Sequence, residues 1–227
     1  MSIKKSSIDI AGKKLTVETG VLAKQSSGAV TVRYGDTLVL CTANSASEPK
    51  DGINFFPLQV EYREKFYGAG KIPGGYFKRE ARPSEKEILS ARLTDRPIRP
   101  LFPKDFKCET QVIINLLSSD QENPGDILGT LGASIALMIS DIPWNGPIAS
   151  LRLGFIDGKT IVNPTFEELE KSTLDLVMTG TSDSIIMMEA ESKEISEEDL
   201  LTVVQYGHEV IKDLNDFQID FIKDIAK

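Results

Sequence analysis

The amino-acid sequence predicts an α+β fold in which mixed β-sheets pack against helices. Short runs with the periodicity or composition of strands fill the N-terminal part of the chain. Several of these runs are separated only by short turns, which indicates hairpins and antiparallel pairing. The later strands and helices do not alternate regularly, as they would in a doubly wound parallel sheet.

Five strands are expected before the first helix, and Gly12 and Gly35 mark the turns of two hairpins. These strands are residues 8–10, 15–18, 30–34, 37–43 and 58–62. Four glycines and a proline in residues 68–75 predict a loop after the fifth strand.

The first helix is expected to begin after Ser84, because Ser84 and Glu87 have the spacing of a capping box. Pro97 and Pro100 are expected to end it, since proline cannot continue a helix. An apolar strand at residues 111–117 should follow.

A second helix, residues 125–140, carries a stripe of small residues along one side. Glycine inside a helix costs roughly 1 kcal/mol relative to alanine, so the stripe predicts that another element packs very close to it. The stripe consists of Gly129, Gly132, Ala133 and Ala136.

The rest of the chain predicts two more hairpins and a long final helix. The hairpins pair residues 150–156 with 160–162 and residues 175–179 with 184–189. Ser196 is the expected N-cap of the last helix, whose apolar residues keep a helical period to Ile225. We therefore expect a domain core at residues 1–195 and a C-terminal helix at residues 196–227.

Composition narrows the class of protein. The 227 residues are 41% hydrophobic, which is ordinary for a globular domain. The sequence has no apolar stretch near the ~20 residues of a membrane span and no apolar region of a signal peptide. Cys41 and Cys108 make no disulfide framework, and Cys41 is expected to be a buried thiol. We expect a cytoplasmic protein without a membrane partner.

Charge is distributed unevenly along the chain. The net charge is −8, yet residues 63–107 contain 12 basic and 6 acidic residues. Six of the eight arginines lie between Arg63 and Arg99. A basic segment within an acidic chain is compatible with binding nucleic acid, and arginine suits the geometry of phosphate.

The motifs for metal binding and nucleophilic catalysis are weak. Two distant cysteines and one histidine nearly exclude zinc, and a lone helical histidine such as His208 is usually structural. Glu189 and Glu191 share one strand face but lack a convincing third acid for a metal ion. These motifs therefore predict neither a metal site nor a catalytic triad.

A short segment after the glycine-rich loop has the composition of a site for single-stranded RNA. It contains Tyr76, Phe77, Lys78 and Arg79, and Arg82 follows. Aromatic faces stack on bases at roughly 1–3 kcal/mol each, and the cations bind phosphates. The alternative for the aromatic side chains is that they anchor the loop on the core.

Arginines of the first helix offer a second basic surface. Arg92, Arg96 and Arg99 recur at helical spacing, and we expect Arg96 and Arg99 to contact RNA. The alternative is that these arginines pair with nearby carboxylates on a solvated face.

The most specific sequence block is YREKFYGAGKIPGGYFKREARPSEKEILSARLTDRPIRPLFP. It strongly resembles the first RNase PH-like domain of bacterial polynucleotide phosphorylases. The blocks NPGDILGTLGASIALMISDIPWNGPIA and TLDLVMTGTSDSIIMMEAES resemble later parts of that domain. The resemblance implies an RNase PH-like fold, with the C-terminal helix beginning a linker toward a second such domain.

The resemblance also implies a function in RNA degradation. In the family, inorganic phosphate attacks the 3′-terminal phosphodiester and releases a nucleoside diphosphate, and Mg²⁺ offsets charge. Three subunits form a ring through which single-stranded RNA passes, and the loop matching residues 76–79 lines the channel. The resemblance therefore implies RNA, a homotrimer and the RNA-degradation machinery as partners.

The residues that perform phosphorolysis in the family are not matched here. An active RNase PH-like domain combines phosphate-holding serines, two aspartates and a lysine. The serine positions match Pro124, Gly125 and Asp126; one aspartate matches Asp175, the lysine matches Val177, and the other aspartate falls near Leu169. The resemblance therefore implies that this chain alone is not catalytic and that the Mg²⁺ ligands lie in the second domain.

Two other functions stay open at this point. The chain has the length of a self-sufficient, single-domain RNase PH-type phosphorolytic exoribonuclease, although the absent serines and lysine argue against that activity. It also fits a non-catalytic, RNA-binding subunit of an exosome-like ring. An assay for phosphorolysis distinguishes the enzyme from the other two.

Overall fold

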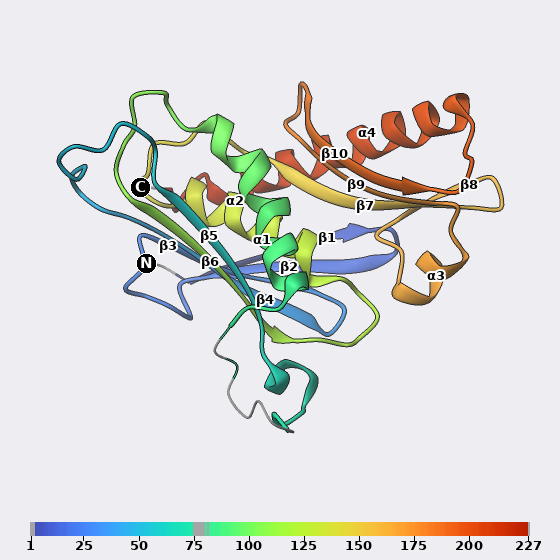
Figure 1. Cartoon of the computed structure of the whole chain (residues 1–227), viewed down its shortest axis with the longest axis horizontal. Coiled ribbons are helices and arrows are strands. Elements are labelled where there is room, and N and C mark those ends of the chain that lie inside the picture. The colour runs from blue at the N-terminus through green and yellow to red at the C-terminus, as the bar shows by residue number, and fades with distance from the viewer. Residues whose placement is uncertain (1–2, 75–79, 81, 227) are drawn as a thin grey trace.

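A computed structural model describes residues 3–74, 80 and 82–226, and it confirms the α+β fold with two sheets packed against helices. Figure 1 shows the two sheets side by side, with the longest helix, α4, lying along the second sheet. Among the described residues, no helix is long and apolar enough to cross a membrane.

The first sheet has six strands in the order β1-β2-β3-β4-β6-β5. Their bounds are β1 Lys4–Ile10, β2 Lys13–Thr19, β3 Gly28–Tyr34, β4 Thr37–Ser45, β5 Leu58–Glu64 and β6 Thr110–Ser118. Neighbours are antiparallel except β5 and β6, which are parallel and require a long crossover. All six expected strands of this region are confirmed, each with small differences at its ends.

The crossover from β5 to β6 contains the first helix. Residues Phe66–Ala69 form a 3₁₀ turn, η1, within the segment expected to be a loop. Helix α1, Glu85–Ile98, begins with the predicted capping box: the Ser84 hydroxyl accepts from the Glu87 N–H, and the Glu87 carboxylate accepts from the Ser84 N–H. Helix α1 packs beside β5 and α2.

Helix α1 ends at Ile98, between the two prolines that were expected to end it, although Pro97 itself is still helical. Pro97 lies inside the last turn of α1, and the chain continues into a second 3₁₀ turn, η2, at Arg99–Leu101. Pro97 and Ile98 are buried, and the Trp144 indole N–H donates to the Ile98 carbonyl. Tertiary packing therefore maintains the helical path although proline removes one backbone donor.

Helix α2, Gly125–Met138, is the centre of the molecule. It contacts β3, β4 and β6 of the first sheet, β7 of the second sheet, and α1 and α4. The predicted close approach is confirmed, because a Cβ at Gly129 would press on Ile114 and one at Gly132 would collide with the Cys41 sulfur. Cys41 is buried as expected, and burial raises the pKa of its thiol.

The second sheet has four antiparallel strands in the order β10-β9-β7-β8. Their bounds are β7 Ala149–Ile156, β8 Lys159–Val162, β9 Leu174–Gly180 and β10 Ile185–Ser192, with the short helix α3, Phe166–Lys171, between β8 and β9. Both predicted hairpins are confirmed.

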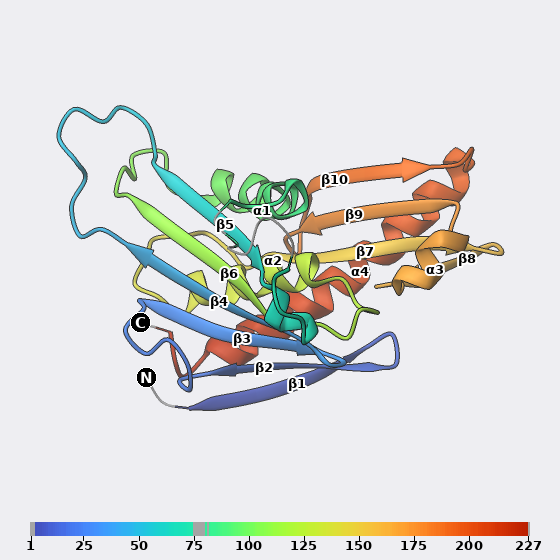
Figure 2. The ribbon, with the colours of Figure 1, turned by 60° about the horizontal axis from the view of Figure 1, so that its bottom comes forward.

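Helix α4, Glu197–Ile222, covers one face of the second sheet and begins at the predicted cap Ser196 (Figure 2). Two buried amides attach it to the core. The Gln218 side chain accepts from the Ser134 hydroxyl at 2.7 Å and donates to the Ile148 carbonyl, and Asn215 donates to the Gly180 carbonyl. The boundary at residue 195 stays a prediction.

We predict that Gly132→Ala lowers the free energy of unfolding by about 1–3 kcal/mol, because its methyl group overpacks the contact with Cys41. The improved helix propensity offsets only part of this loss. Urea unfolding measures the change. Gly74→Ala is the matched control, because a Cβ there meets nothing within 4 Å. Equal stability of Gly132→Ala and the parent chain would contradict the tight packing.

Candidate functional site

Only some of the predicted RNA-binding residues lie in the part of the chain that the structure describes. Tyr76, Phe77, Lys78 and Arg79 lie outside the described residues. Arg82 is exposed two residues before the cap of α1, and it has no ion-pair partner among the residues that the structure describes.

The two arginines predicted to bind RNA from the first helix, Arg96 in α1 and Arg99 at the start of η2, are both paired with acids. Arg96 donates to Glu189 of β10 at 2.6 Å, and half of each side chain is exposed. Arg99 binds both carboxylate oxygens of Asp95, and it also donates to the Leu58 carbonyl at 3.2 Å. These pairs match the alternative of a solvated, ion-paired face. An exposed pair contributes little stability, so exchanging the Glu189 carboxylate for another anion costs little.

Arg92 differs from its neighbours on α1. Its side chain is exposed, and within the described ranges it forms no ion pair. It lines a groove between α1 and β5.

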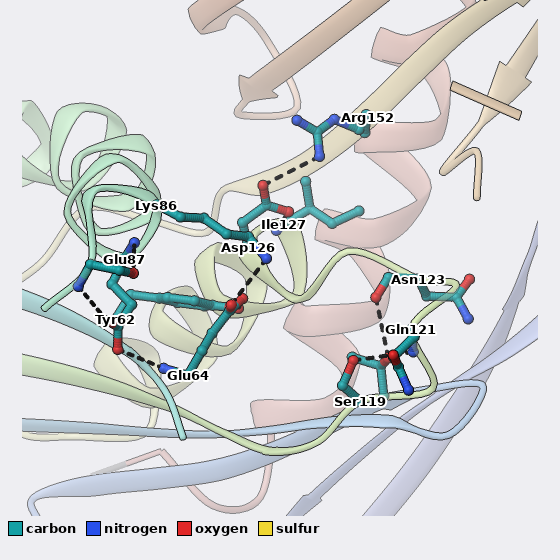
Figure 3. Close-up of polar contacts among 12 residues, drawn as sticks. Tyr62, Glu64, Lys86, Glu87, Ser119, Gln121, Asn123, Asp126, Ile127 and Arg152 are labelled. Atoms are coloured by element: carbon teal, nitrogen blue, oxygen red, sulfur yellow. Dashed lines mark hydrogen bonds and ion pairs between the residues drawn. The ribbon is translucent and has the colours of Figure 1, made fainter. Parts of the chain in front are cut away.

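The N-terminus of α2 is occupied by a carboxylate of the chain itself. Asp126 is in the first turn, its Oδ1 accepts from the Ile127 N–H at 2.8 Å, and its Oδ2 accepts from Arg152 at 3.4 Å (Figure 3). A helix N-terminus favours an anion, and here the Asp126 side chain supplies it. Only 12% of this side chain is exposed.

Arg152 joins Asp126 to the second sheet. From β7 it donates through Nε to Asp175 of β9 at 2.8 Å, and 17% of its side chain is exposed. Val177, Glu189 and Glu191 line the same cavity of about 340 Å³. The structure therefore brings together residues 124–126, 175 and 177, which resemblance assigns to the serine cluster, one aspartate and the lysine.

This arrangement does not fit a phosphate or a metal ion. The Asp126 carboxylate would repel phosphate at the helix N-terminus, and Arg152 already pairs with two carboxylates. Leu169 lies on α3 and supplies no second aspartate. In the part of the chain that the structure describes, no three His, Cys, Asp or Glu side chains lie close enough to hold a metal ion.

The loop before α2 is held by a second carboxylate. Asp120 accepts from the N–H groups of Glu122 and Asn123, from the Asn123 side chain, and from the Thr37 hydroxyl at 2.8 Å. Burial alone would raise the pKa of Asp120, but these hydrogen bonds together lower it to about 2. They connect the start of β4 to the chain that enters α2.

A hydrogen-bonded cluster lies on the other side of the α2 N-terminus. The Tyr62 hydroxyl donates to Glu64 at 2.9 Å, and Lys86 pairs with the other Glu64 oxygen (Figure 3). Burial raises the pKa of Tyr62 further above its ordinary value, which already leaves the hydroxyl protonated at neutral pH. Lys65 and Lys71 line the adjoining cavity of about 430 Å³.

Sequence reasoning missed Arg152 and Asp120. Arg152 carried a usable signal, because it is one of only two arginines outside the basic segment. No sequence signal pointed to Asp120, since its hydrogen-bond partners come from β4 and from its own loop. His208 contacts the Thr181 carbonyl at 3.1 Å, which agrees with a structural histidine.

Sequence comparison shows which family this chain belongs to. Residues 11–143 match the pattern of the 3′ exoribonuclease family, domain 1, and residues 146–210 match domain 2 of that family. The chain belongs to the 3′ exoribonuclease family. The first match contains strands β2 to β6 of the six-stranded sheet with α1 and α2, and the second contains the four-stranded sheet and about half of α4.

Three curated relatives of this chain are all named polyribonucleotide nucleotidyltransferase. The chain is 53% identical to the polyribonucleotide nucleotidyltransferase of Heliobacterium modesticaldum over 95% of the chain and 30% of the relative. It is 54% identical to that of Thermomicrobium roseum over 96% and 28%, and 55% identical to that of Halalkalibacterium halodurans over 97% and 31%. The chain spans less than a third of the length of these relatives.

Solved structures agree with the family's fold. The crystal structure of rice (Oryza sativa) Rrp46 superposes with a TM-score of 0.68 at 16% identity, covering 95% of this chain and 92% of that one. An Archaeoglobus fulgidus exosome with RNA bound to the active site gives 0.67 at 18% identity, covering 93% and 89%. The RNase PH-like fold expected from sequence is confirmed.

We predict that Arg152→Leu lowers the free energy of unfolding by about 2–3 kcal/mol, because it leaves the Asp126 carboxylate without its cation. Adding Asp126→Ser, the residue type of active family members, should recover part of this loss. Urea unfolding measures both. Arg33→Leu is the matched control, since Arg33 forms only an exposed ion pair. A loss as large for Arg33→Leu would contradict a specific role for Arg152.

Proposed function

We propose that this chain is the first RNase PH-like domain of a bacterial polyribonucleotide nucleotidyltransferase. In that role it is the RNA-binding and ring-assembly half of a phosphorolytic 3′→5′ exoribonuclease that degrades mRNA. The observation that carries the proposal is the 53–55% identity to such enzymes over at least 95% of the chain. Identities of 16–18% to the solved structures give no comparable support to the other two functions.

The chain by itself is proposed to be inactive. Phosphorolysis needs a cradle for inorganic phosphate and stabilisation of the charge that develops as phosphate attacks. Asp126 occupies the place of that cradle with a negative charge, and Val177 occupies the place of the lysine. The parent enzyme's phosphate and Mg²⁺ would therefore bind through residues of its second domain.

RNA binding is proposed for the loop at Tyr76, Phe77, Lys78 and Arg79, together with Arg82. The aromatic and basic composition supports this role, as does the exposed and unpaired position of Arg82 in the described chain. Arg96 and Arg99 are proposed to extend this surface along α1. Arg96 would exchange an exposed carboxylate for phosphate, whereas Arg99 would also give up contacts with β5.

The parent enzyme is further proposed to be a cytoplasmic homotrimer that binds single-stranded RNA and partners of the RNA-degradation machinery. The relationship to the bacterial enzymes supports this assembly. The basic segment supports the RNA partner, because its +6 charge contrasts with −14 for the remaining residues.

We predict that the isolated chain releases no appreciable nucleoside diphosphate from oligoadenylate in the presence of phosphate and Mg²⁺. The rate per mole should lie at least about 10³-fold below that of the longer enzyme, because the chain lacks the stabilising groups. The longer enzyme in the same assay is the positive control. Appreciable diphosphate release by the chain alone would favour the self-sufficient RNase PH-type enzyme instead.

We predict that Lys78→Ala combined with Arg79→Ala in the longer enzyme weakens oligoadenylate binding and flattens its salt dependence. Each lost phosphate contact should reduce the slope of log affinity against log salt by about 0.7. Filter binding from low to high salt measures both effects. Lys212→Ala with Lys223→Ala is the matched control, because these lysines pair with acids of their own helix. An unchanged slope in the loop variant would refute the loop assignment.

A further inference from the structure

The connection from β5 to α1 is tied together at its base. Residues 65–84 leave the end of β5 and return to the cap of α1. Two contacts join the two sides of this connection: the Glu64 N–H donates to the Glu87 carboxylate at 2.9 Å, and Lys86 pairs with the Glu64 carboxylate at 3.0 Å (Figure 3). The end of β5 is therefore fixed to the first turn of α1.

The 3₁₀ turn η1, Phe66–Ala69, is attached to the first sheet. Its buried residue Gly68 lies beside the end of β6, and the Gly68 carbonyl accepts from the Ser119 N–H at 2.8 Å. A Cβ at Gly68 would lie 3.3 Å from the Leu116 carbonyl oxygen, so η1 packs closely on β6. Phe66, the first residue of η1, therefore occupies a fixed position beside the sheet.

Both backbone groups of Phe66 bind residues that flank the proposed RNA-binding loop. The Phe66 carbonyl accepts from the Lys71 N–H at 2.9 Å, and the Phe66 N–H donates to the Glu80 carboxylate at 2.7 Å. The eight residues between Lys71 and Glu80 are thus anchored at both ends to one residue. A loop whose ends are already held loses less conformational entropy when a ligand orders its side chains.

Lys65 completes the attachment of Glu80. Its ammonium group donates to the Glu80 main-chain carbonyl at 3.2 Å and lies 3.7 Å from the second carboxylate oxygen of Glu80. Only 27% of the Lys65 side chain and 26% of the Glu80 side chain are exposed, so water and salt screen this pair less than a surface pair. Glu80 directly follows Arg79 in the sequence, and a carboxylate without a partner there would compete with phosphate for that arginine. Pairing with Lys65 reduces this competition.

We propose that Glu80 is a positioning residue for RNA binding and acts through the loop that ends at Arg79. Bound to Phe66 and Lys65, Glu80 fixes the C-terminal end of the loop, so that the aromatic and basic side chains meet RNA at a lower entropic cost. This inference rests on the proposed role of the loop in RNA binding. It gives a supporting role to an acidic residue that charge alone would predict to oppose RNA.

The test compares oligoadenylate binding by the longer enzyme and by its Glu80→Ala variant in filter binding over a range of salt concentrations. We expect the variant to bind about threefold to tenfold more weakly at every salt concentration, because the loop loses its attachment. The slope of log affinity against log salt should stay that of the parent, since all the loop cations remain. A carboxylate that only repelled RNA would give the opposite result, tighter binding, when it is removed.

Two further variants and a kinetic measurement separate positioning from other effects. Glu80→Gln keeps an acceptor for the Phe66 N–H and should recover most of the lost affinity. Glu18→Ala is the matched control and should bind RNA like the parent, because Glu18 on β2 also pairs with a lysine, at 3.9 Å, and 32% of its side chain is exposed. In phosphorolysis by Glu80→Ala, KM should rise while kcat stays within about twofold of the parent, which a loss of folded enzyme would not produce.

The loop variant Lys78→Ala with Arg79→Ala tests whether Glu80 acts through the loop. In that background Glu80→Ala should have a smaller effect on affinity than in the parent, because the two changes affect the same contacts. Unchanged or tighter binding by Glu80→Ala, an equal loss for Glu18→Ala, or an undiminished loss in the loop variant would overturn the positioning role. Weaker binding by the loop variant without any loss for Glu80→Ala would reject this inference alone, whereas no loss for either would reject the role of the loop as well.

Discussion

The burial of α2 between the two sheets is the constraint on which the rest of the molecule depends. Almost every residue of this helix is buried, and it contacts both sheets and both long neighbouring helices. The Gly129 and Gly132 backbone lies so close to β6 and β4 that side chains there would collide. A helix held this tightly has its N-terminus fixed in space, and its first turn therefore meets β7 and the Arg152 side chain in a defined geometry.

A helix terminus of fixed geometry holds an anion in a defined place. The same position can stabilise a bound phosphate or a carboxylate supplied by the chain, since both are anions at the positive end of a helix. In this chain the carboxylate is Asp126, and Arg152 neutralises it together with Asp175. The Asp126 side chain thus makes the N-terminus of α2 part of a structural ion cluster.

Most of the fold could be predicted from sequence because its signals are local. Hairpins at Gly12 and Gly35, the capping box at Ser84 and the small-residue stripe each depend on residues close together in the chain. The parallel pairing of β5 with β6 and the interior position of Pro97 depend on contacts between distant segments, which periodicity does not encode. The site shows the same division. Its departures from the family pattern, such as Asp126 and Val177, can be read from the sequence, whereas the pairing of Arg152 with Asp126 and of Arg96 with Glu189 required the three-dimensional structure.

The parallel pairing of β5 with β6 has a consequence for how this family can diversify. The 45 residues from Lys65 to Glu109 connect β5 to β6 outside the sheet. The basic segment at residues 63–107 nearly coincides with this connection. The entropic free-energy cost of closing such a connection rises by only about 0.6 kcal/mol for each doubling of its length. Its surface chemistry can therefore change by insertion or substitution while the buried sheet that anchors both ends stays the same.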